Sequence, residues 1–305
     1  MDVSIIIVNY KTPQMVCDCI RSVYAKTEDV DFEVIVVDNH SEDSIDTMLQ
    51  QAFDNKVKVV MLEENLGFGQ ANNKGLEVAS GRNILFLNPD TLLINNAIKS
   101  LCDLLDNNTD IGACGGNLYD ADMKPTHSFR RLLPGIRWEL HEMTAHRLEH
   151  VIYGGNWTFN HSHHPLDVAY IAGADLMVKR HVLDQVGPFS PVFFMYNEDT
   201  DLCLRIHQAH YRIVALPTAH IQHLEGASTK HAKEADIPRG ILLSEQGRQR
   251  YYHKNVGRLR RIFAEAIYRW SLHQSWILGL IIKHPSTRVF KQRIDAIHQL
   301  NNCHP

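Results

Sequence analysis

The alternation of short apolar runs with helix-like stretches restricts the fold of this chain more than any other feature. The apolar, β-branched runs span Val3–Val8, Glu33–Val37, Val57–Leu62 and Ile84–Leu87. Helix-like stretches lie between them, at about residues 14–25, 44–53 and 70–79. This order predicts an α/β fold in which a mostly parallel sheet carries helices on both faces. The chain has 305 residues, enough for one large core or two closely joined halves.

Polar residues follow each of the four apolar runs. They are Asn9-Tyr10, Asp38-Asn39, Glu63-Glu64-Asn65 and Asn88-Pro89-Asp90. In open parallel sheets, ligands bind beyond the carboxyl ends of the strands. A turn or a helix cap explains any single one of these segments. Four strand ends in succession favour a binding site along this edge.

The rest of the chain divides into two further parts. Residues 116–235 are less regular; they include a His-rich loop at His161–His164 and an expected strand at Val168–Val178. That loop is either a flexible segment or a metal site. Residues 236–305 have the pattern of basic helices. We therefore expect three parts: residues 1–115, residues 116–235 of the same domain, and a basic helical tail (236–305).

Composition excludes several classes of protein. With 44% hydrophobic residues, 22% charged residues and a formal net charge of −4, the chain resembles an ordinary globular protein and gives no indication of nucleic-acid binding. The six cysteines have no C-x-x-C spacing, which favours reduced thiols in a cytoplasmic protein. The N-terminal apolar run is too short and too acidic in its flank for a signal peptide, so we expect no export.

Five motifs in sequence resemble those of family 2 glycosyltransferases. They are Ser4–Tyr10, Val36–Asn39, Asn65–Gly75 (NLGFGQANNKG), Leu87–Thr91 (LNPDT) and the pair Gly173–Arg180 with Phe193–Arg205. The similarity covers about residues 3–230. Its Asn-Pro-Asp variant is similar to that of bacterial rhamnosyltransferases.

This resemblance implies a GT-A-type fold and an inverting, metal-assisted glycosyltransferase. It also implies that residues 1–115 are the nucleotide-sugar-binding half and residues 116–235 the acceptor-binding and catalytic half of one domain. The expected donor is a nucleotide-diphosphate sugar such as dTDP-rhamnose or a UDP-sugar. The expected acceptor is a saccharide or lipid-linked glycan in cell-surface polysaccharide assembly. The sugar and the linkage are left open by the sequence.

Donor-binding roles follow from the same motifs. Asp38, at the end of a buried strand, suits the imide N–H of a pyrimidine base; its alternative is a helix cap before Ser41–Leu49. Free N–H groups at the start of the third helix would attract phosphates. The full expected donor set is Val8, Asn9, Tyr10, Asp38, Asn65, Gly67, Phe68, Asn72, Asn88 and Asp90.

The resemblance also implies a divalent cation, Mg²⁺ or Mn²⁺. Asn88-Pro89-Asp90 replaces the family's more usual acid-x-acid pattern, so only Asp90 supplies an anionic ligand there. His223 matches the late histidine of the family and is the second expected ligand, since imidazole suits Mn²⁺-like ions. His220, three residues earlier, is the neighbour most easily confused with it.

Inversion requires a base that takes the proton of the acceptor hydroxyl. By resemblance this base is Asp199, with Glu198 beside it, at the start of an expected helix. The alternative is that acids in the first turn merely stabilise the helix dipole, which is the expectation for Asp201. Arg130 and Asp175 are weaker candidates for contacts with the acceptor.

Other functions fit the sequence less well. A sugar nucleotidyltransferase would carry a Gly-rich basic loop after the first strand, where Asn9–Thr12 has no glycine. An NAD-dependent enzyme would carry G-x-G-x-x-G there. A catalytically silent saccharide- or nucleotide-binding subunit would not need Asp90, Asp199 and His223 together.

The tail has its own expected role. Residues 246–305 contain eleven Lys and Arg but only Glu265 and Asp295 as acids. Leu259, Ile262, Phe263, Ala266, Ile267 and Trp270 fall on one helical face. This face predicts either peripheral binding to an anionic membrane surface or packing on the catalytic domain or on a second subunit in a homo-oligomer.

Overall fold

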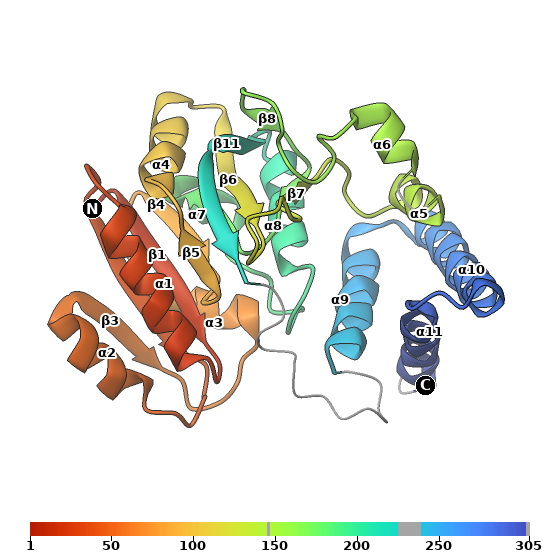
Figure 1. Ribbon diagram of the computed structural model, residues 1–305, viewed down its shortest axis with the longest axis horizontal. Helices are drawn as coiled ribbons and strands as arrows, with labels where there is room; N and C mark the ends of the chain where they lie inside the picture. The colour runs from red at the N-terminus through yellow and green to blue at the C-terminus, as the bar shows by residue number, and fades with distance from the viewer. Residues whose placement is uncertain (145–146, 225–238, 303–305) are drawn as a thin grey trace.

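The computed structural model describes residues 1–144, 147–224 and 239–302 (Figure 1). The strands are β1 (Val3–Asn9), β2 (Phe32–Asp38), β3 (Val57–Met61), β4 (Asn83–Leu87), β5 (Thr91–Leu93), β6 (Ile111–Tyr119), β7 (Phe129–Arg130), β8 (Leu166–Asp167), β9 (Tyr170–Ile171), β10 (Asp175–Lys179) and β11 (Arg212–His223). The helices are α1 (Pro13–Lys26), α2 (Ile45–Phe53), α3 (Phe68–Val78), α4 (Ala97–Asn107), α5 (Ile136–Met143), α6 (Arg147–Tyr153), α7 (Arg180–Val186), α8 (Glu198–Gln208), α9 (Arg239–Asn255), α10 (Arg258–Ile282) and α11 (Thr287–Asn302).

One nine-stranded sheet forms the centre of the fold. Its order is β3-β2-β1-β4-β10-β6-β11-β5, and β8 pairs with β11. The first four strands pair in parallel, in agreement with the alternation of apolar runs and helices. The sequence did not show that β10 then inserts between β4 and β6, antiparallel to both. As a result, strands that are far apart in the chain end at the same edge of the sheet.

The expected single strand at Val168–Val178 is wrong. The segment divides into β9, which ends at Ile171, and β10, which begins at Asp175. Between them, the backbone N–H of Gly173 donates to Oδ2 of Asp199, 2.9 Å away. This turn needs a tertiary partner, so local β propensity does not reveal it.

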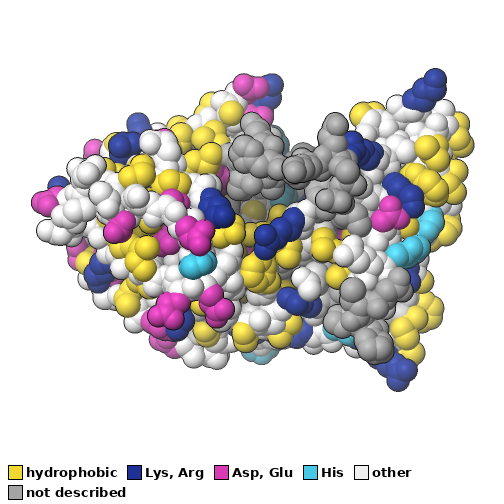
Figure 2. Space-filling view, turned by 90° about the horizontal axis from the view of Figure 1, so that it is seen from below, with side chains coloured by type: hydrophobic (Ala, Val, Ile, Leu, Met, Phe, Trp, Pro, Cys, Tyr) yellow, Lys and Arg dark blue, Asp and Glu magenta, His cyan; other side chains and the backbone are white. Residues whose placement is uncertain are grey.

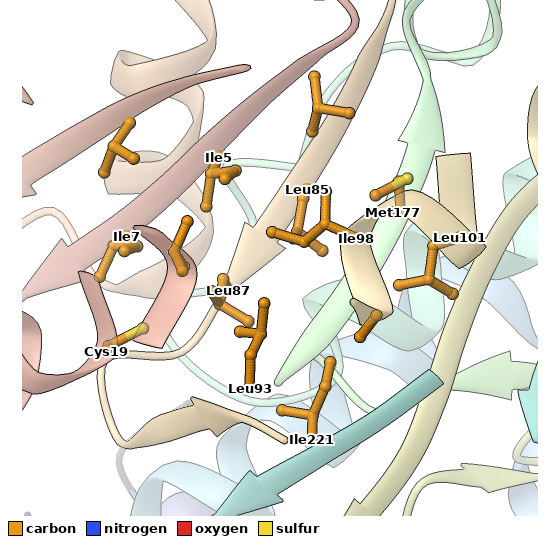
Figure 3. Close-up of a cluster of buried hydrophobic side chains, with 14 of the residues drawn as sticks. Ile5, Ile7, Cys19, Leu85, Leu87, Leu93, Ile98, Leu101, Met177 and Ile221 are labelled. Atoms are coloured by element: carbon orange, nitrogen blue, oxygen red, sulfur yellow. The ribbon is translucent and has the colours of Figure 1, made fainter. Parts of the chain in front are cut away.

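Both faces of the sheet are covered by helices, as predicted. One face packs against α1, α2 and α4 around Ile5, Leu85, Leu101 and Met177, which are fully buried (Figure 3). The other face packs against α3, α7 and α8. The five described cysteines are buried and form no disulfide; Cys303 lies outside the described residues.

The C-terminal helices α9, α10 and α11 stand beside the sheet together with α5 (Figure 1). A buried polar network holds them. Glu139 of α5 accepts from Arg248 Nη2 at 2.7 Å and from the Tyr252 hydroxyl at 2.5 Å, both of α9. Glu245 accepts from the Tyr268 hydroxyl at 2.5 Å. The expected boundary between residues 235 and 236 lies outside the described residues, so the division into parts stays a prediction.

Candidate functional site

The predicted metal ligands Asp90 and His223 lie side by side at the edge of the sheet. Asp90 Oδ1 is 3.3 Å from His223 Nε2. Strand pairing fixes this approach, because His223 is the register partner of Thr91 and the N–H of Leu224 donates to the Asp90 carbonyl at 2.9 Å. His220 points elsewhere, with its Nε2 2.9 Å from the Pro217 carbonyl. Of the two histidines that are three residues apart in the sequence, His223 therefore lies beside Asp90 and His220 does not.

Asn88 completes the polar group around Asp90 and His223. Its Nδ2 is 3.4 Å from His223 Nε2, and its buried Oδ1 has no hydrogen-bond partner. A carboxylate, an imidazole and an unpaired amide oxygen are donors that Mg²⁺ or Mn²⁺ accepts, with phosphate oxygens and water filling the other positions. The residues therefore fit a divalent cation. Among the described residues, no cluster of three or more His, Cys, Asp or Glu is arranged to hold a metal without such help.

Asp199 is connected to this group through two consecutive residues of one turn. The N–H of Asn88 donates to the Ala174 carbonyl at 2.9 Å, and the N–H of the preceding Gly173 donates to Asp199 Oδ2 at 2.9 Å. Asp199 Oδ1 accepts from the N–H and hydroxyl of Thr200, at 2.6 and 3.1 Å. The carboxylate is half-buried and held in one orientation. The structure thus brings the predicted base to the same edge as Asp90 and His223.

Glu198 begins α8 but is almost fully buried, at 5% exposure. It lies against α3, where a Cβ on Gly69 would be 3.4 Å from Glu198 Cβ. Its Oε2 has no hydrogen-bond partner. Burial, reinforced by the neighbouring charge of Asp199, raises the pKa of Glu198 to about 8. Burial also raises the pKa of Asp199, while hydrogen bonds from Thr200 and Gly173 counteract that effect.

Glu198→Gln should stabilise the protein increasingly as pH rises. A carboxyl whose pKa is higher in the folded than in the unfolded state destabilises the fold once the unfolded chain ionises. For Glu198 this destabilisation increases as the pH rises from 4.5, the usual pKa of a glutamate, to about 8, its pKa in the folded protein. Glutamine does not ionise and causes no such destabilisation. The free energy of unfolding from urea titrations, taken as variant minus wild type, should therefore increase between these pH values. A difference that is flat with pH would show that Glu198 titrates normally.

Asp201 does not act as a simple first-turn acid. It is fully buried, and its oxygens accept from Lys254 Nζ at 2.7 and 2.8 Å and from Asn255 Nδ2 at 2.8 Å, both on α9. Arg205 Nε also donates to it, at 3.0 Å. The expectation of a helix-dipole role is therefore incomplete, because Asp201 joins α8 to the C-terminal helices. A contact over 53 residues gives no local sequence signal.

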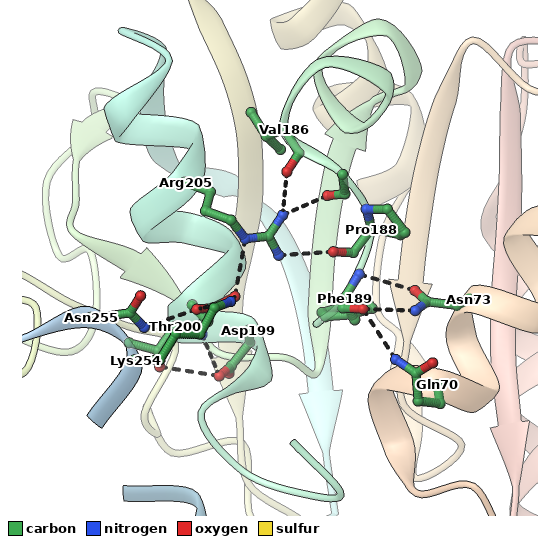
Figure 4. A network of polar contacts seen from close by, with 12 residues as sticks. Gln70, Asn73, Val186, Pro188, Phe189, Asp199, Thr200, Arg205, Lys254 and Asn255 are labelled. Atoms are coloured by element: carbon green, nitrogen blue, oxygen red, sulfur yellow. Dashed lines mark hydrogen bonds and ion pairs between the residues drawn. The ribbon is translucent and has the colours of Figure 1, made fainter. Parts of the chain in front are cut away.

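Arg205 is a positioning residue that sequence reasoning missed. Its guanidinium donates to the carbonyls of Val186, Gly187 and Pro188 at 2.6, 2.6 and 2.8 Å (Figure 4). On the other side of this segment, Gln70 and Asn73 of α3 donate to the Phe189 carbonyl. The chain leading to Glu198 and Asp199 is thus tied to α8 and α3. In the sequence, only the polar side chains within Gln70–Asn73 indicated this contact.

The proposed base-binding residues are largely enclosed. Asn9 Nδ2 donates to Asp38 Oδ1 at 2.7 Å, and the N–H of Ser41 donates to Asp38 Oδ2 at 3.1 Å. Asp38 is 2% exposed and does not cap α2, which begins at Ile45. Each carboxylate oxygen retains a second lone pair for a ligand. Val8 belongs to the core, so of Val8, Asn9 and Tyr10 only Tyr10 presents an exposed side chain.

Two N–H groups at the start of α3, which the sequence suggested would be free, are paired within the protein. The N–H of Gly67 donates to Asn65 Oδ1 and that of Phe68 to the Phe194 carbonyl, each at 2.9 Å. Gly67 has a positive φ of 81°, and a Cβ there would lie 2.0 Å from the Phe194 oxygen. Asn72 is buried and donates to the Phe68 carbonyl. The N–H groups of Gly67 and Phe68 are therefore already paired in this conformation, and a donor-binding role for these two residues stays a prediction.

The two acceptor candidates are placed differently. Asp175 is fully buried at the start of β10, where its Oδ2 accepts from the Gly116 N–H at 2.5 Å. Asp175 therefore presents no exposed side-chain surface in this conformation, and its expected acceptor role stays a prediction. Arg130 lies between two indole rings, 5.1 Å from the centroid of Trp138 and 5.0 Å from that of Trp157. It borders β9, beside the turn that holds Asp199.

The family model described as "Glycosyl transferase family 2" matches residues 4–165, more than half of the chain. The chain belongs to glycosyltransferase family 2. The N-acetylglucosaminyl-diphospho-decaprenol L-rhamnosyltransferase of Mycobacterium tuberculosis is 28% identical over 213 residues, which are 64% of this chain and 67% of that protein. The family predicted from five short motifs is thus confirmed.

Solved structures support the GT-A fold of this family 2 member. GalNAc-T7, crystallised with UDP, GalNAc and Mn²⁺, superposes with a TM-score of 0.58 at 13% identity; the match covers 93% of this chain but 58% of that one. The mannosyltransferase PcManGT from Pyrobaculum calidifontis, in complex with GDP-Man and Mn²⁺, gives 0.59 at 14% identity and covers 97% and 86%. At such identities the likeness shows the fold alone.

Proposed function

We propose that this family 2 glycosyltransferase transfers a sugar, with inversion, from a nucleotide-diphosphate donor to a saccharide or lipid-linked glycan. The donor we favour is dTDP-rhamnose, with a UDP-sugar second. Two observations support the class of substrate: the polar edge where β1, β2 and β4 end, and a relative whose name states rhamnosyl transfer to a diphospho-polyprenol saccharide. Assembly of a cell-surface polysaccharide on the cytoplasmic side of the membrane would use such a reaction.

In the proposed reaction the acceptor hydroxyl oxygen bonds to the anomeric carbon of the donor sugar. The bond from that carbon to the diphosphate oxygen breaks on the opposite face, and the nucleoside diphosphate leaves. Asp199 takes the hydroxyl proton. Gly173 and Thr200 aim its carboxylate, and the pKa of the neighbouring Glu198 is raised to about 8 by burial and by the charge of Asp199. Asp90 and His223 would hold a divalent cation, which would neutralise the charge of the diphosphate.

A single observation carries this proposal: one turn joins the base to the cation-binding pair. Asn88 hydrogen-bonds to Ala174, and the adjacent Gly173 hydrogen-bonds to Asp199. Asp90, two residues after Asn88, contacts His223. Inverting transfer needs a base and a leaving-group site on opposite sides of the anomeric carbon. The turn connects the residues proposed for these two roles. A saccharide-binding subunit without activity has no need for this connection.

A donor screen tests the proposal. The purified protein is incubated with UDP-, dTDP- and GDP-sugars, with and without Mn²⁺, and the unfolding temperature is measured. A ligand that binds only the folded state raises that temperature, and at a given concentration a tighter ligand raises it further. We expect stabilisation by one nucleotide class, larger with Mn²⁺, and release of that nucleoside diphosphate when acceptor is added. No stabilisation by any sugar nucleotide would contradict the proposal, and binding without release would identify a silent subunit.

A further inference from the structure

Helix α10 carries apolar side chains on two opposite faces, and only one of them is packed. Ala264, Tyr268 and Leu272 form the inner stripe and are buried against neighbouring helices. A soluble helix that packs on one side usually presents polar residues on the other. The outer side of α10 departs from that pattern. Its apolar face therefore needs an explanation other than the core.

The outer stripe runs the length of the helix at helical spacing. Leu259 is 73% exposed, Phe263 62%, Trp270 51%, Ile277 51% and Ile281 71%. These intervals of four and seven residues place all five side chains on one line of the surface. Ile262 and Leu280, 50% and 57% exposed, widen the stripe. Figure 2 shows hydrophobic side chains gathered along the end of the molecule that these helices form.

This outcome refines what the sequence suggested for the tail. The face from Leu259 to Trp270 was expected to bind a membrane or to pack on protein. Within the described chain it does not pack on protein; a different stripe does. Exposed apolar stripes of this length mark interaction sites in folded proteins.

Positive charge borders the outer stripe. Residues 258–302 contain eight Lys and Arg but only Glu265 and Asp295 as acids. Both acids are engaged, Glu265 with Arg261 at 3.9 Å and Asp295 with Lys291 at 2.7 Å. Arg258, Arg260 and Arg269 make no ion pair with any described residue. The free charge along this helix is therefore all positive.

A cavity opens on the inner side of α10, where Tyr268 of the inner stripe lines it. It has a volume of about 660 Å³ and lies between α9, α10 and α11. Its charged lining consists of Arg248, Arg250, Lys254, Arg269 and Glu265, with His253 beside them. No described carboxylate pairs with Arg250. Among the cations of this cavity, Arg248 is paired with Glu139 and Lys254 with Asp201, which leaves Arg250 and Arg269 without a described carboxylate partner.

Charge distinguishes the two occupants that could cover the stripe. A second copy packed through α10 would place arginine rows opposite arginine rows, whereas helix pairs are stabilised by opposite charges beside the apolar seam. An acidic lipid surface supplies the missing negative charge. No described helix is long and apolar enough to cross a bilayer, and the inner stripe of α10 already packs on protein. A helix that lies along the membrane interface meets both conditions.

We propose that the outer face of α10 lies in the interface of an anionic lipid bilayer. Trp270 and the aliphatic side chains enter the boundary between headgroups and acyl chains. Arg258, Arg260 and Arg269 contact the lipid phosphates. This inference stands apart from the proposed transfer reaction, since it rests on α10 alone; if both hold, it would bring the enzyme to the surface that carries a lipid-linked acceptor.

Vesicle flotation of the full chain tests this inference. Vesicles of phosphatidylcholine alone are compared with vesicles containing equal parts of phosphatidylglycerol. We expect the protein to float with the anionic vesicles, and less so as salt increases. The variant Phe263→Ser with Trp270→Ser should lower the partition coefficient at least about tenfold, because two large apolar side chains no longer enter the interface. Arg258→Glu with Arg260→Glu should abolish the preference for anionic lipid.

A matched control is Met61→Ser, which removes an apolar side chain of similar exposure, 53%, from the edge strand β3. Its flotation should equal that of wild type, and circular dichroism should show all variants folded. Failure of the wild type to float at low salt overturns the inference. So does a wild-type dimer in light scattering that the Phe263 and Trp270 substitutions convert to monomer. Transfer to a water-soluble acceptor by the non-floating variant would show that the two proposals are independent.

Discussion

Asp199→Asn should lower the rate of glycosyl transfer by at least about a hundredfold, since general-base catalysis typically contributes 10²–10⁴-fold. Asparagine keeps the size of the side chain but cannot take the acceptor proton. The measurement is turnover at saturating donor, with the pH profile of kcat/KM as a second readout. Wild type should show a limb at low pH where Asp199 becomes protonated, and that limb should vanish in the variant.

The structure adds a cost that the sequence did not suggest. Both Asp199 oxygens accept from backbone N–H groups, one from Gly173 and one from Thr200. The asparagine amide must turn its NH₂ toward one of these donors, which loses a hydrogen bond worth about 0.5–1.5 kcal/mol. Removal of a carboxylate whose pKa is raised by burial acts in the opposite direction, so we expect the free energy of unfolding to change little near neutral pH. Donor binding, measured by calorimetry, should stay close to that of wild type.

A matched control separates chemistry from positioning. Thr200→Val removes the hydroxyl that donates to Asp199 at 3.1 Å but keeps the carboxylate and the backbone N–H. It should retain most of the activity and keep the limb at low pH. Turnover near the wild-type level in Asp199→Asn, with donor saturating, would remove Asp199 from the mechanism. Glu198 would then be the carboxylate to test next.

Local periodicity predicted the half of the fold in which neighbours in sequence are neighbours in space. The bounds of β1 and β4 agree with the apolar runs to within one residue. The polar residues after them lie at one edge because parallel strands point the same way. Asp90 and His223 were paired by motif alone, since 133 positions separate them in the chain.

The features that the sequence did not predict depend on contacts between residues that are far apart in the chain. The N–H groups of the loop at Gly67 were expected to be free. The N–H of the adjacent Phe68 instead donates to the carbonyl of Phe194, which lies more than a hundred residues later in the chain. The inner apolar stripe of α10 was not predicted, because Tyr268 carries a polar hydroxyl. In the structure this hydroxyl donates to Glu245. In each case a polar group is satisfied by a partner that no local pattern specifies.

Asp90→Asn and His223→Ala should each weaken nucleoside-diphosphate binding in the presence of Mn²⁺ by at least about tenfold. Loss of a residue behind the ligands commonly costs 10–100-fold in metal affinity, and loss of a ligand should cost no less. Calorimetric titration of UDP or dTDP, whichever the donor screen selects, measures the effect. For the wild type, EDTA should lower affinity to about that of the variants.

His220→Ala is the matched control for His223→Ala. Both histidines lie on β11, three residues apart, but His220 contacts the Pro217 carbonyl whereas His223 contacts Asp90. Removing His220 should leave both Mn²⁺-dependent binding and the response to EDTA unchanged.

Asn88→Ala extends the test to the third donor, because the Oδ1 of Asn88 has no protein partner and its Nδ2 makes only the 3.4 Å contact with His223 Nε2. A fall in Mn²⁺-dependent affinity with little change in unfolding temperature is the expected result, since a merely structural amide would lower the unfolding temperature instead. If nucleotide binding is indifferent to EDTA and to every substitution at Asn88, Asp90 and His223, the diphosphate is neutralised by protein cations rather than by a metal.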